Sequence, residues 1–397
     1  MSFDIALSGI QAINEQLETV SNNIANAATY GFKSSRANFS SVYAGSKANG
    51  VEIGSITQSI TQNGSAVTTG RGLDAAIDGR GFFVSRDLQG GLSYTRVGIF
   101  DTDTEGYLID SNKKRVQGYG PANGGALGPM GDIKIPTGQV PAVATSTLDF
   151  AGNMSADWKV PTGALNIANS DTYNMVRQSK VFDSLGTQHS LTQYFVKKDN
   201  NTVNVFYSFD GAAPTSTTVP DHSLVFGADG KLAATSANKA FAFTPTNGAN
   251  AGSVAIDYTG TTRFAGEATN TNNLNNGYAS GAYKGVELAA DGSLVAQYSN
   301  NQPQVVGTLA IATFANEGAL NPMSDTSWSA NADSGDALYN TPGVGLSGKL
   351  STGALEGSNV DITSELVGLM TSQRNYQANS KVLSTESQMM QALMQAM

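Results

Sequence analysis

The chain has 397 residues, of which 14% are charged, with a net charge of −9 and no cysteine. This length can bury one or more sizeable cores, while the acidic balance argues against binding to nucleic-acid phosphates. The missing cysteine excludes disulfides, thiolate catalysis and cysteine-ligated metals. Because 40% of the residues are hydrophobic and glycine is abundant, the composition indicates turns and strands rather than disorder.

Residues 1–33 predict a long helix. Apolar residues recur at alternating steps of three and four, as at the a and d positions of a coiled coil, and they are Phe3, Ala6, Ile10, Ile13, Leu17, Val20, Ile24 and Ala27. The flanking positions carry mainly Asn, Gln, Ser and Thr instead of Glu and Lys, so we expect this helix to pack against other protein. Spaced apolar residues without a basic leading segment are not the pattern of a cleaved signal peptide.

Short β-strands dominate the middle of the chain. Val51, Ile53 and Ile56 predict a short strand or an extended arm after the first helix. Antiparallel strands joined by turns are then predicted at 81–86, 92–100, 107–110 and 114–119. Residues 148–282 form a second β-rich region, with predicted strands at 180–183, 190–197, 202–209, 223–226 and 253–258. The first pattern resumes at 285–288, 293–298 and 304–314, so we expect the strands on both sides of the central region to share one sheet system.

Residues 361–397 predict a second long helix, capped by Asp361. Its apolar stripe contains Leu366, Leu369, Tyr376, Leu383, Met390 and Met394, and it is interrupted by the polar residues Gln373, Ser380 and Ser387. The two terminal stripes are expected to pair with each other. No run of about 18 consecutive apolar residues occurs, so no membrane-spanning helix is predicted.

The expected fold class is therefore mixed and mainly β, with three domains. A coiled-coil-like core of paired terminal helices with an extended arm comprises residues 1–70 and 353–397. A discontinuous inner β domain comprises 71–147 and 283–352, and an outer β domain, 148–282, is inserted in it. From periodicity alone, a secreted β-rich binding module or adhesin on a coiled-coil stalk is an alternative, but the low charge of the helices favours self-assembly.

Several motifs are similar to catalytic or ligand-binding sequences, but each lacks a residue or a context that the function requires. The segment 101–106 begins like a calcium loop, but Asn112 stands where the loop needs a bidentate Glu. The segment 343–349 is similar to a phosphate-binding loop, but Leu350 follows it and has no hydroxyl for magnesium. His189 and His222 have no partner at zinc-ligand spacing. Asp74 and Asp78 would suit a carbohydrate-active enzyme only in a concave site. We therefore predict no enzyme activity and no catalytic, cofactor or metal site.

The segment 22–33 closely resembles the N-terminal signature of the bacterial flagellar rod and hook proteins. The resemblance is carried by Asn22, Asn23, Asn26, Thr29, Gly31, Phe32 and Lys33. Further blocks of the same family are similar to residues 70–84, which include Gly81, Phe82 and Phe83, and to 94–100 and 106–109. At the other end, 353–361 with Asn359, Val360 and Asp361, and 373–379 with Gln373, Arg374 and Tyr376, resemble the C-terminal signature.

Within this family the chain is most similar to the hook proteins, because rod proteins lack so large a central insertion. A distal rod protein or a hook–filament junction protein is the alternative. The resemblance implies a subunit that is exported by the flagellar type III apparatus without a cleaved signal peptide and that forms a hollow flexible tube outside the cell. The implied partners are copies of itself, the distal rod protein, the hook cap, the hook–filament junction proteins and the export apparatus. Nucleic acid, membrane insertion and cofactors are not expected.

Overall fold

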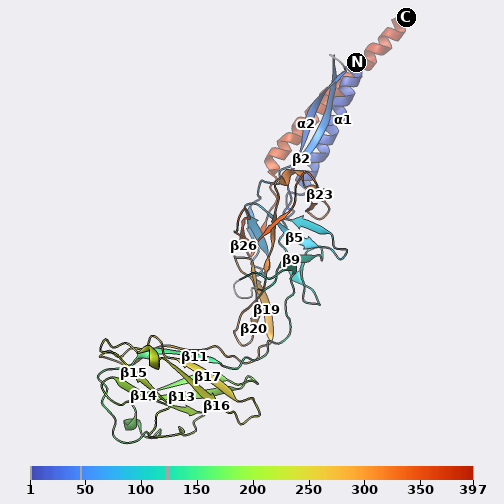
Figure 1. The fold of residues 1–397 in the computed structure, drawn as a ribbon. Helices are drawn as coiled ribbons and strands as arrows, with labels where there is room; N and C mark the ends of the chain where they lie inside the picture. Colours follow the sequence, from blue (N-terminus) through green and yellow to red (C-terminus); the bar gives the residue numbers. More distant parts are fainter. Residues whose placement is uncertain (1, 45–46, 122–125, 397) are drawn as a thin grey trace. The chain divides into compact units, whose positions relative to one another are not determined.

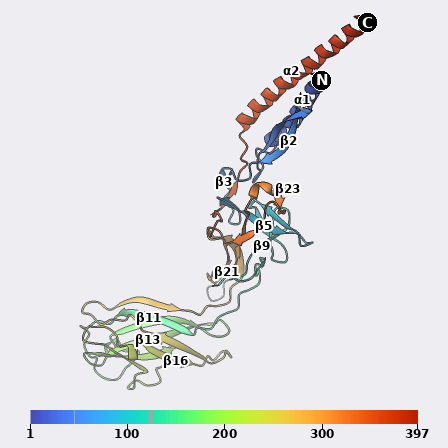
Figure 2. The ribbon, with the colours of Figure 1, turned by 45° about the horizontal axis from the view of Figure 1, so that its top comes forward.

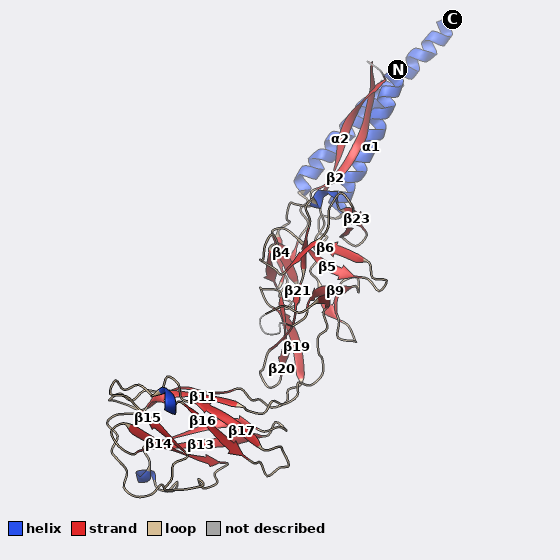
Figure 3. Ribbon diagram, in the orientation of Figure 1, coloured by secondary structure: helices blue, strands red, loops and turns tan. Residues whose placement is uncertain are grey.

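The structure is a computed structural model that describes residues 2–44, 47–121 and 126–396. It divides into two compact units, of which the first comprises Met1–Thr137, Gly285–Gln297 and Pro303–Met397, and the second Gly138–Lys284 and Tyr298–Gln302. Strands make up most of the regular structure, and one long helix lies near each terminus (Figures 1 and 3). The predicted fold class, mixed and mainly β with paired terminal helices, is therefore confirmed.

The helical part of the first unit consists of helix α1 (Ser2–Ala25), helix α2 (Ile362–Ala396) and a β-hairpin. The hairpin pairs β1 (Ser35–Ala44) with β2 (Lys47–Gln58) in antiparallel register and lies along α1 (Figure 2). It is longer than the short strand or arm that the sequence predicts. The apolar residues of β1 are separated irregularly by serines and an asparagine, so they do not alternate strictly with polar residues. The strand therefore depends on its contact with α1.

The β part of the first unit is built around a sheet of 13 strands. Strands before and after the central region pair directly, since Tyr119 of β9 lies opposite Thr308 of β21 and Phe83 of β5 opposite Ile311 of β22. The main path of the sheet runs through β19 (Tyr283–Leu288), β20 (Ser293–Tyr298), β21 (Gln304–Leu309), β9 (Arg115–Tyr119), β5 (Phe82–Arg86), β6 (Leu92–Thr95), β24 (Ser327–Ser329) and β23 (Asn321–Met323). The remaining members are β7 (Phe100–Thr102), β8 (Leu108–Asp110), β10 (Met130–Asp132), β22 (Ile311–Thr313) and β25 (Leu338–Asn340).

Two small antiparallel pairs join this sheet to the helices. Strand β3 (Ala66–Thr68) pairs with β27 (Ala354–Glu356), and β4 (Ala75–Asp78) pairs with β26 (Lys349–Thr352). The chain that leaves the helical part and the chain that returns to it are thus hydrogen-bonded to each other.

Two predicted strands of the first unit are interrupted. The predicted strand 92–100 ends at Thr95 and resumes at Phe100, because the carbonyl of Gly98 accepts a hydrogen bond from the backbone N–H of Ala75 at 2.9 Å. The predicted strand 304–314 breaks at Ala310, whose N–H donates to the Gln117 carbonyl at 3.2 Å. In both places a backbone group bonds to another element, which sequence periodicity does not show.

The second unit is a sandwich of two four-stranded sheets. One sheet has the order β12 (Met175–Phe182), β13 (Gln188–Lys197), β14 (Thr202–Phe209) and β15 (His222–Val225). The other has the order β16 (Asn238–Phe243), β17 (Gly252–Asp257), β11 (Thr147–Asn153) and β18 (Thr269–Asn275). Both sheets contribute to one apolar core, which includes Phe150, Leu191, Phe195, Val254 and Ile256. Strands β11, β16 and β18 are absent from the sequence prediction because Thr, Asn and Ala obscure their alternation.

Side chains of β18 close one edge of this sandwich. The amide of Asn273 donates to the Gln178 carbonyl at 3.0 Å, and the amide of Asn275 donates to the Lys180 carbonyl. These carbonyls belong to β12, an edge strand of the opposite sheet. The asparagines therefore satisfy backbone groups that would otherwise be open to a further strand.

Candidate assembly interface

The terminal helices lie antiparallel and in close contact. The Asn23 amide of α1 donates to a Glu365 carboxylate oxygen of α2 at 2.8 Å. Two turns from the other end of α1, a Cβ placed on Gly9 would lie 2.8 Å from the Asn379 amide nitrogen. A side chain at position 9 would therefore displace the Asn379 amide, so the glycine leaves room for that side chain where the helices meet.

The buried face of α1 only partly coincides with the predicted stripe. Of the stripe residues, Ala6, Ile13 and Val20 are buried, Ile10, Leu17 and Ile24 are half-buried, and Phe3 is exposed. The other buried residues are Gly9, Ala12, Thr19 and Asn23. The buried face is rotated because α1 also contacts the hairpin: the Val51 N–H donates to the Ser8 hydroxyl at 3.2 Å.

Most of α2 is exposed in the single chain. Leu369 and Leu383 are half-buried, whereas Leu366, Tyr376, Met390 and Met394 are exposed, Met394 by 73%. Gln373 and Arg374 are exposed as well. The less exposed residues of α2 are the two leucines Leu369 and Leu383 together with small or polar residues, which include Glu365, Ser372 and Asn379.

The C-terminal end of α2 extends past the start of α1 (Figure 1). The contacts of Asn23 with Glu365 and of Gly9 with Asn379 place the first described residues of α1 level with Glu386. Residues 387–396 continue beyond this level. They include Met389 and Met390, which are 55% and 59% exposed. Flexible apolar side chains of this kind suit contacts with another surface.

Asn23 of the family signature joins three segments. Its amide also donates to the Ser35 carbonyl at 2.8 Å, and its side-chain oxygen accepts from the Ser35 N–H at 2.9 Å. With the bond to Glu365, this buried side chain connects α1, the start of the hairpin and the first turn of α2. Its conversion to an apolar residue would leave backbone groups of Ser35 without partners.

The other N-terminal signature residues end α1 and set the direction of the chain. Asn26 donates to the Asn22 carbonyl at 3.0 Å and accepts from the Thr29 hydroxyl at 3.1 Å. Gly31 has φ +69°, and a Cβ there would lie 2.9 Å from a methyl carbon of Val97. Both the backbone angle and the space require glycine at this position.

Lys33 is the buried charged member of the signature. Its ammonium lies 2.6 Å from a Glu356 carboxylate oxygen and donates to the Gln62 carbonyl at 2.7 Å, and its side chain is 0% exposed. Arg96, also buried, lies 3.3 Å from the other Glu356 oxygen. Burial lowers the pKa of Lys33, and the attraction to Glu356 opposes that effect. We call Lys33, Arg96 and Glu356 the charged joint.

The C-terminal signature continues from this joint. The Asn359 side chain accepts from the Ser34 N–H at 2.7 Å and donates to the Ser59 and Gln62 carbonyls at 2.9 and 3.0 Å. Val360 is half-buried. Asp361 caps α2 as predicted, accepting from the Thr363 N–H at 3.0 Å. Hydrogen bonds from Ser364 and Thr363 hold the pKa of the Asp361 carboxyl below its ordinary value.

The central signature residues lie in the core of the β part. Gly81 has φ +118°, and a Cβ there would clash with Ile311. Phe82 contacts Phe314 and Trp328 edge to face, and Phe83 contacts Phe100 in the same way. The structure thus brings Asn359 together with the signature residues that follow α1, and it places the other signature residues in the β core and at the start of α2 and along it.

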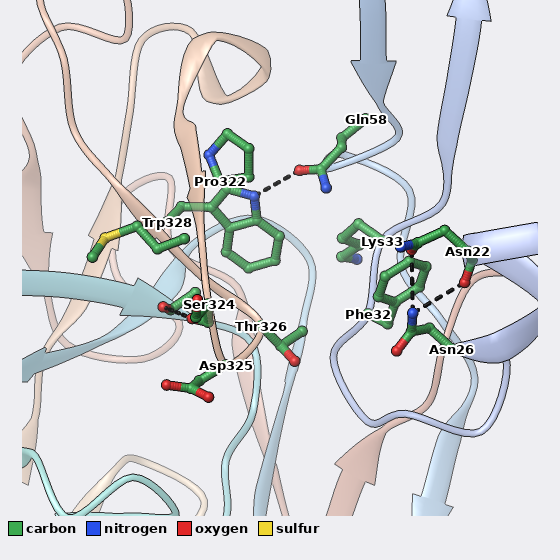
Figure 4. A pocket seen from close by; sticks show the side chains of 12 residues that line it. Asn22, Asn26, Phe32, Lys33, Gln58, Pro322, Ser324, Asp325, Thr326 and Trp328 are labelled. Atoms are coloured by element: carbon green, nitrogen blue, oxygen red, sulfur yellow. Dashed lines mark hydrogen bonds between the residues drawn. The ribbon is translucent and has the colours of Figure 1, made fainter. Parts of the chain in front are cut away.

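A groove of about 460 Å³ lies beside the end of α1 (Figure 4). Phe32, Asn22 and Asn26 line one side, and Trp328 with the loop Ser324–Thr326 lines the other. The Trp328 indole donates to the Gln58 side chain at 2.8 Å. Among the twelve lining residues, Asp325 is the one carboxylate and histidine is absent, so the groove does not present a paired acid and base.

The other chemical candidates have structural roles. Asp74 is buried and accepts from the Thr69 hydroxyl at 2.7 Å, whereas Asp78 is exposed at the end of β4. Residues 101–106 form part of a strand and a turn, and 343–348 form a turn before β26. Within the described residues, no three His, Cys, Asp or Glu side chains gather as metal ligands. None of the described helices has the length and apolar character to span a membrane.

Models of four families match the chain. They are "Flagella basal body rod protein" at residues 3–33, "Flagellar hook protein FlgE/F/G D1 domain" at 76–156, "Flagellar basal body protein FlaE D2 domain" at 153–278 and "Flagellar basal body rod FlgEFG protein C-terminal" at 351–396. Their order and coverage define a structural protein of the flagellar rod and hook class, not an enzyme.

Relatives that match over their full length identify which member of this class the chain is similar to. The chain is 37% identical over 405 residues to the flagellar hook protein FlgE of Escherichia coli K12, covering 99% of both chains. It is 37% identical over 409 residues to that of Salmonella typhimurium LT2, again over 99% of both. The chain belongs to the flagellar hook protein family, and it functions as a structural subunit of the hook, as the sequence resemblance predicts. The crystal structure of the Helicobacter pylori hook protein FlgE2 shares the fold, with a TM-score of 0.55 and 13% identity over 73% of this chain and 100% of that chain.

Proposed function

We propose that copies of this chain assemble helically into a hollow tube that bends while it transmits torque from the rotary motor to the filament. The observation that carries this proposal is the apolar surface of α2. Leu366, Met390 and Met394 are exposed along α2, and of its predicted apolar stripe Leu369 and Leu383 alone are half-buried. A helix with so little intrachain burial gains its stabilisation from neighbouring protein, which in a homopolymer is another copy.

In the proposed tube the three predicted domains form three layers. The paired helices (1–70 and 353–397) form the inner wall, the inner β domain (71–147 and 283–352) the middle shell, and the inserted domain (148–282) the outer surface. The self-contained core of the second unit supports an outer position for the inserted domain, because it needs no additional burial. The hydrogen-bonded pairs β3–β27 and β4–β26 support a continuous path from the helices to the inner β domain.

We further propose that bending uses the weakly charged surface of the helices. Contacts made by Asn, Gln, Ser, Thr and Met can exchange among similar arrangements as subunits slide, whereas ion-pair networks favour one geometry. The long exposed face of α2 supports this view, since Arg374 and Lys381 are its only cationic residues.

The location and partners follow from the same proposal. We infer that the subunit is exported through the flagellar type III apparatus and lies outside the cell, with the distal rod protein, hook cap and hook–filament junction proteins as its further partners. Retention of the N-terminal segment is supported by its role in the fold. Ala6, Gly9, Ala12 and Ile13 are buried, so cleavage within this segment would remove the contact of α1 with α2.

The test is to place the same charges on two faces of the extension of α2. Met390→Asp with Met394→Asp replaces exposed apolar residues, whereas Gln391→Asp with Gln395→Asp changes exposed polar residues in the same turns. We expect the methionine pair to block tube formation, as seen by electron microscopy, and the glutamine pair to retain it. Both proteins should keep the far-ultraviolet circular dichroism of their β part. Normal tubes from the methionine variant would contradict the proposal.

A further inference from the structure

His189 in the second unit lies between two carboxylates. Its Nδ1 is 2.6 Å from an Asp210 oxygen, and its Nε2 is 3.1 Å from an Asp183 oxygen. The ring stacks on Phe209 with a centroid distance of 5.0 Å and an interplanar angle of 26°. Asp183 follows β12, His189 lies near the start of β13, and Asp210 follows β14, so one imidazole connects three neighbouring strand ends.

The two carboxylates are held differently. Asp183 is buried, and one of its oxygens accepts from the Leu185 and Thr187 N–H groups at 2.9 and 2.8 Å. Its other oxygen accepts from the Asn247 amide at 2.6 Å, which attaches the loop between β16 and β17 in the opposite sheet. The Asp210 side chain is 45% exposed and has one backbone donor, the Ser190 N–H at 2.8 Å.

Only a charged imidazole satisfies both contacts. A neutral imidazole carries one N–H, so its other nitrogen would present a lone pair to a carboxylate oxygen. Burial alone would lower the pKa of His189, but hydrogen bonds to Asp210 and Asp183 outweigh burial and raise the pKa above its ordinary value. At Asp183, hydrogen bonds from Asn247, His189 and the backbone outweigh burial and hold the carboxyl pKa below its ordinary value.

We propose that His189 is a pH-sensitive clasp in the second unit, which joins Asp183 to Asp210 when it is charged and releases Asp210 when it loses its proton. Asp183 is the side that stays bound, because two backbone N–H groups and Asn247 fix its position. Asp210 is the side that moves, because its half-exposed carboxylate can turn to water. The charged groups that face the ring are these two carboxylates, while Phe209 and Asn247 are neutral.

The direction of the pH effect follows from the raised pKa. The stabilisation from the clasp is fully present below the unfolded-state pKa of about 6.5 and is lost as the pH rises through the higher folded-state value. The loss loosens the connection between the ends of β13 and β14. The core and the opposite edge of the sandwich do not involve His189 and are unaffected.

The chain provides its own control, because it contains two histidines. The Nε2–H of His222 donates to the Ser236 carbonyl, 2.8 Å away, and burial lowers the pKa of His222. In the full chain, we would follow both imidazole C–H signals and the Ser190 amide by nuclear magnetic resonance during a pH titration. We expect His189 to titrate above about 6.5, with the Ser190 amide following the same midpoint. A His189 midpoint at or below that value would overturn the proposal.

Two variants separate the clasp from a merely structural histidine. Asp210→Asn keeps the shape of the side chain and should lower the His189 midpoint toward its ordinary value. The melting temperature of this variant should fall below that of the native chain at acidic pH and equal it above the native midpoint. His222→Gln should leave both results unchanged. A melting difference for Asp210→Asn that is independent of pH, or an unchanged His189 midpoint, would overturn the clasp. Neither measurement depends on assembly.

Discussion

In the second unit, buried tyrosine hydroxyls and the edge carbonyls of β12 have hydrogen-bond partners within the unit, whereas most apolar residues along α2 are exposed. The Tyr207 hydroxyl lies 2.9 Å from the Tyr258 hydroxyl, which donates to the buried Gln193 side chain at 2.6 Å. Amides of β18 cover the edge of β12. Such a domain is complete as a single copy.

Helix α2 is built in the opposite way. Leu366 is 46% exposed and Met394 is 73% exposed, while Leu369 and Leu383 of the same stripe are half-buried. Isolated helices gain little stability from backbone hydrogen bonds alone, so most of their stabilisation comes from packing. One chain thus combines a region with a complete core and a helix whose burial is incomplete in a single copy, so substitutions in each region should have separate effects.

The largest expected effect is the loss of assembly in Leu17→Asp. Leu17 is half-buried in the apolar stripe of α1, and a carboxylate there must lose its hydration when copies pack together. Ile24→Asp should act in the same way. We expect no tubes by electron microscopy and an unchanged melting temperature for the second unit. Asn14→Asp, an exposed position one turn earlier, is the control that adds the same charge. Normal tubes from Leu17→Asp would show that this seam is not required.

The charged joint gives the next largest effect. Glu356→Ala leaves the buried cations Lys33 and Arg96 without their common carboxylate. Removing one partner of a buried ion pair costs about 3–5 kcal/mol, so the first unit should unfold at a lower urea concentration while the second unit is unchanged. Glu105→Ala removes a carboxylate that pairs with Arg115 at the surface and should cost less than about 1 kcal/mol. Equal losses in the two variants would contradict the importance of the joint.

A moderate effect is expected from Tyr258→Phe. This change leaves the buried Gln193 oxygen without its donor, at a cost of about 1–3 kcal/mol to the second unit alone. Tyr43→Phe, at a residue that is 63% exposed in the hairpin, should remain within about 0.5 kcal/mol of the native chain. Thermal unfolding, monitored by circular dichroism in the aromatic region, would measure the stability of both variants. If Tyr258→Phe instead lowers the melting temperature of the first unit, the two units do not unfold independently.

The smallest effect concerns the edge of the sandwich. Asn273→Ala removes the donor to the Gln178 carbonyl and the acceptor of the Ser179 hydroxyl, which lie at 3.0 and 2.6 Å. We expect a loss of about 1 kcal/mol and weak association through the opened edge of β12 at high concentration, seen by sedimentation velocity. Thr271→Ala, at an exposed position of the same strand, is the control. A monomer at all concentrations would mean that other features protect this edge.

The sequence predicts both helices because their signal is local, but α1 ends at Ala25 and not near Lys33, since the side chains of Asn26 and Thr29 form a turn there. Steps of three and four define α1 and α2, and Asp361 marks the start of α2 as a side-chain cap. The rotation of the buried face of α1 could not be predicted, because it depends on a hairpin whose own strands lack clear alternation. Strands β11, β16 and β18 were missed for the same reason.

The charged joint shows that contacts between residues far apart in the sequence could not be predicted from the sequence. Lys33 belongs to the N-terminal signature, but its partner Glu356 is 323 positions away. Both Glu356 and Arg96 lie in blocks that resemble the family, but nothing in those blocks indicates that the two residues form a buried ion-pair cluster. Their pairing with Lys33 depends on the fold and has no trace in spacing or periodicity.

The charged joint also determines how a load passes through the first unit. Lys33 follows the end of α1, and Glu356 precedes the start of α2, so both helices are fastened to the β part at one buried place. A pull on either helix reaches the same carboxylate, and Arg96 fixes that carboxylate to the sheet side. We therefore expect the two helices to move as one body that is attached to the β part at this ion-pair cluster. A torque on the helices is then transmitted to the β part and does not slide one helix past the other.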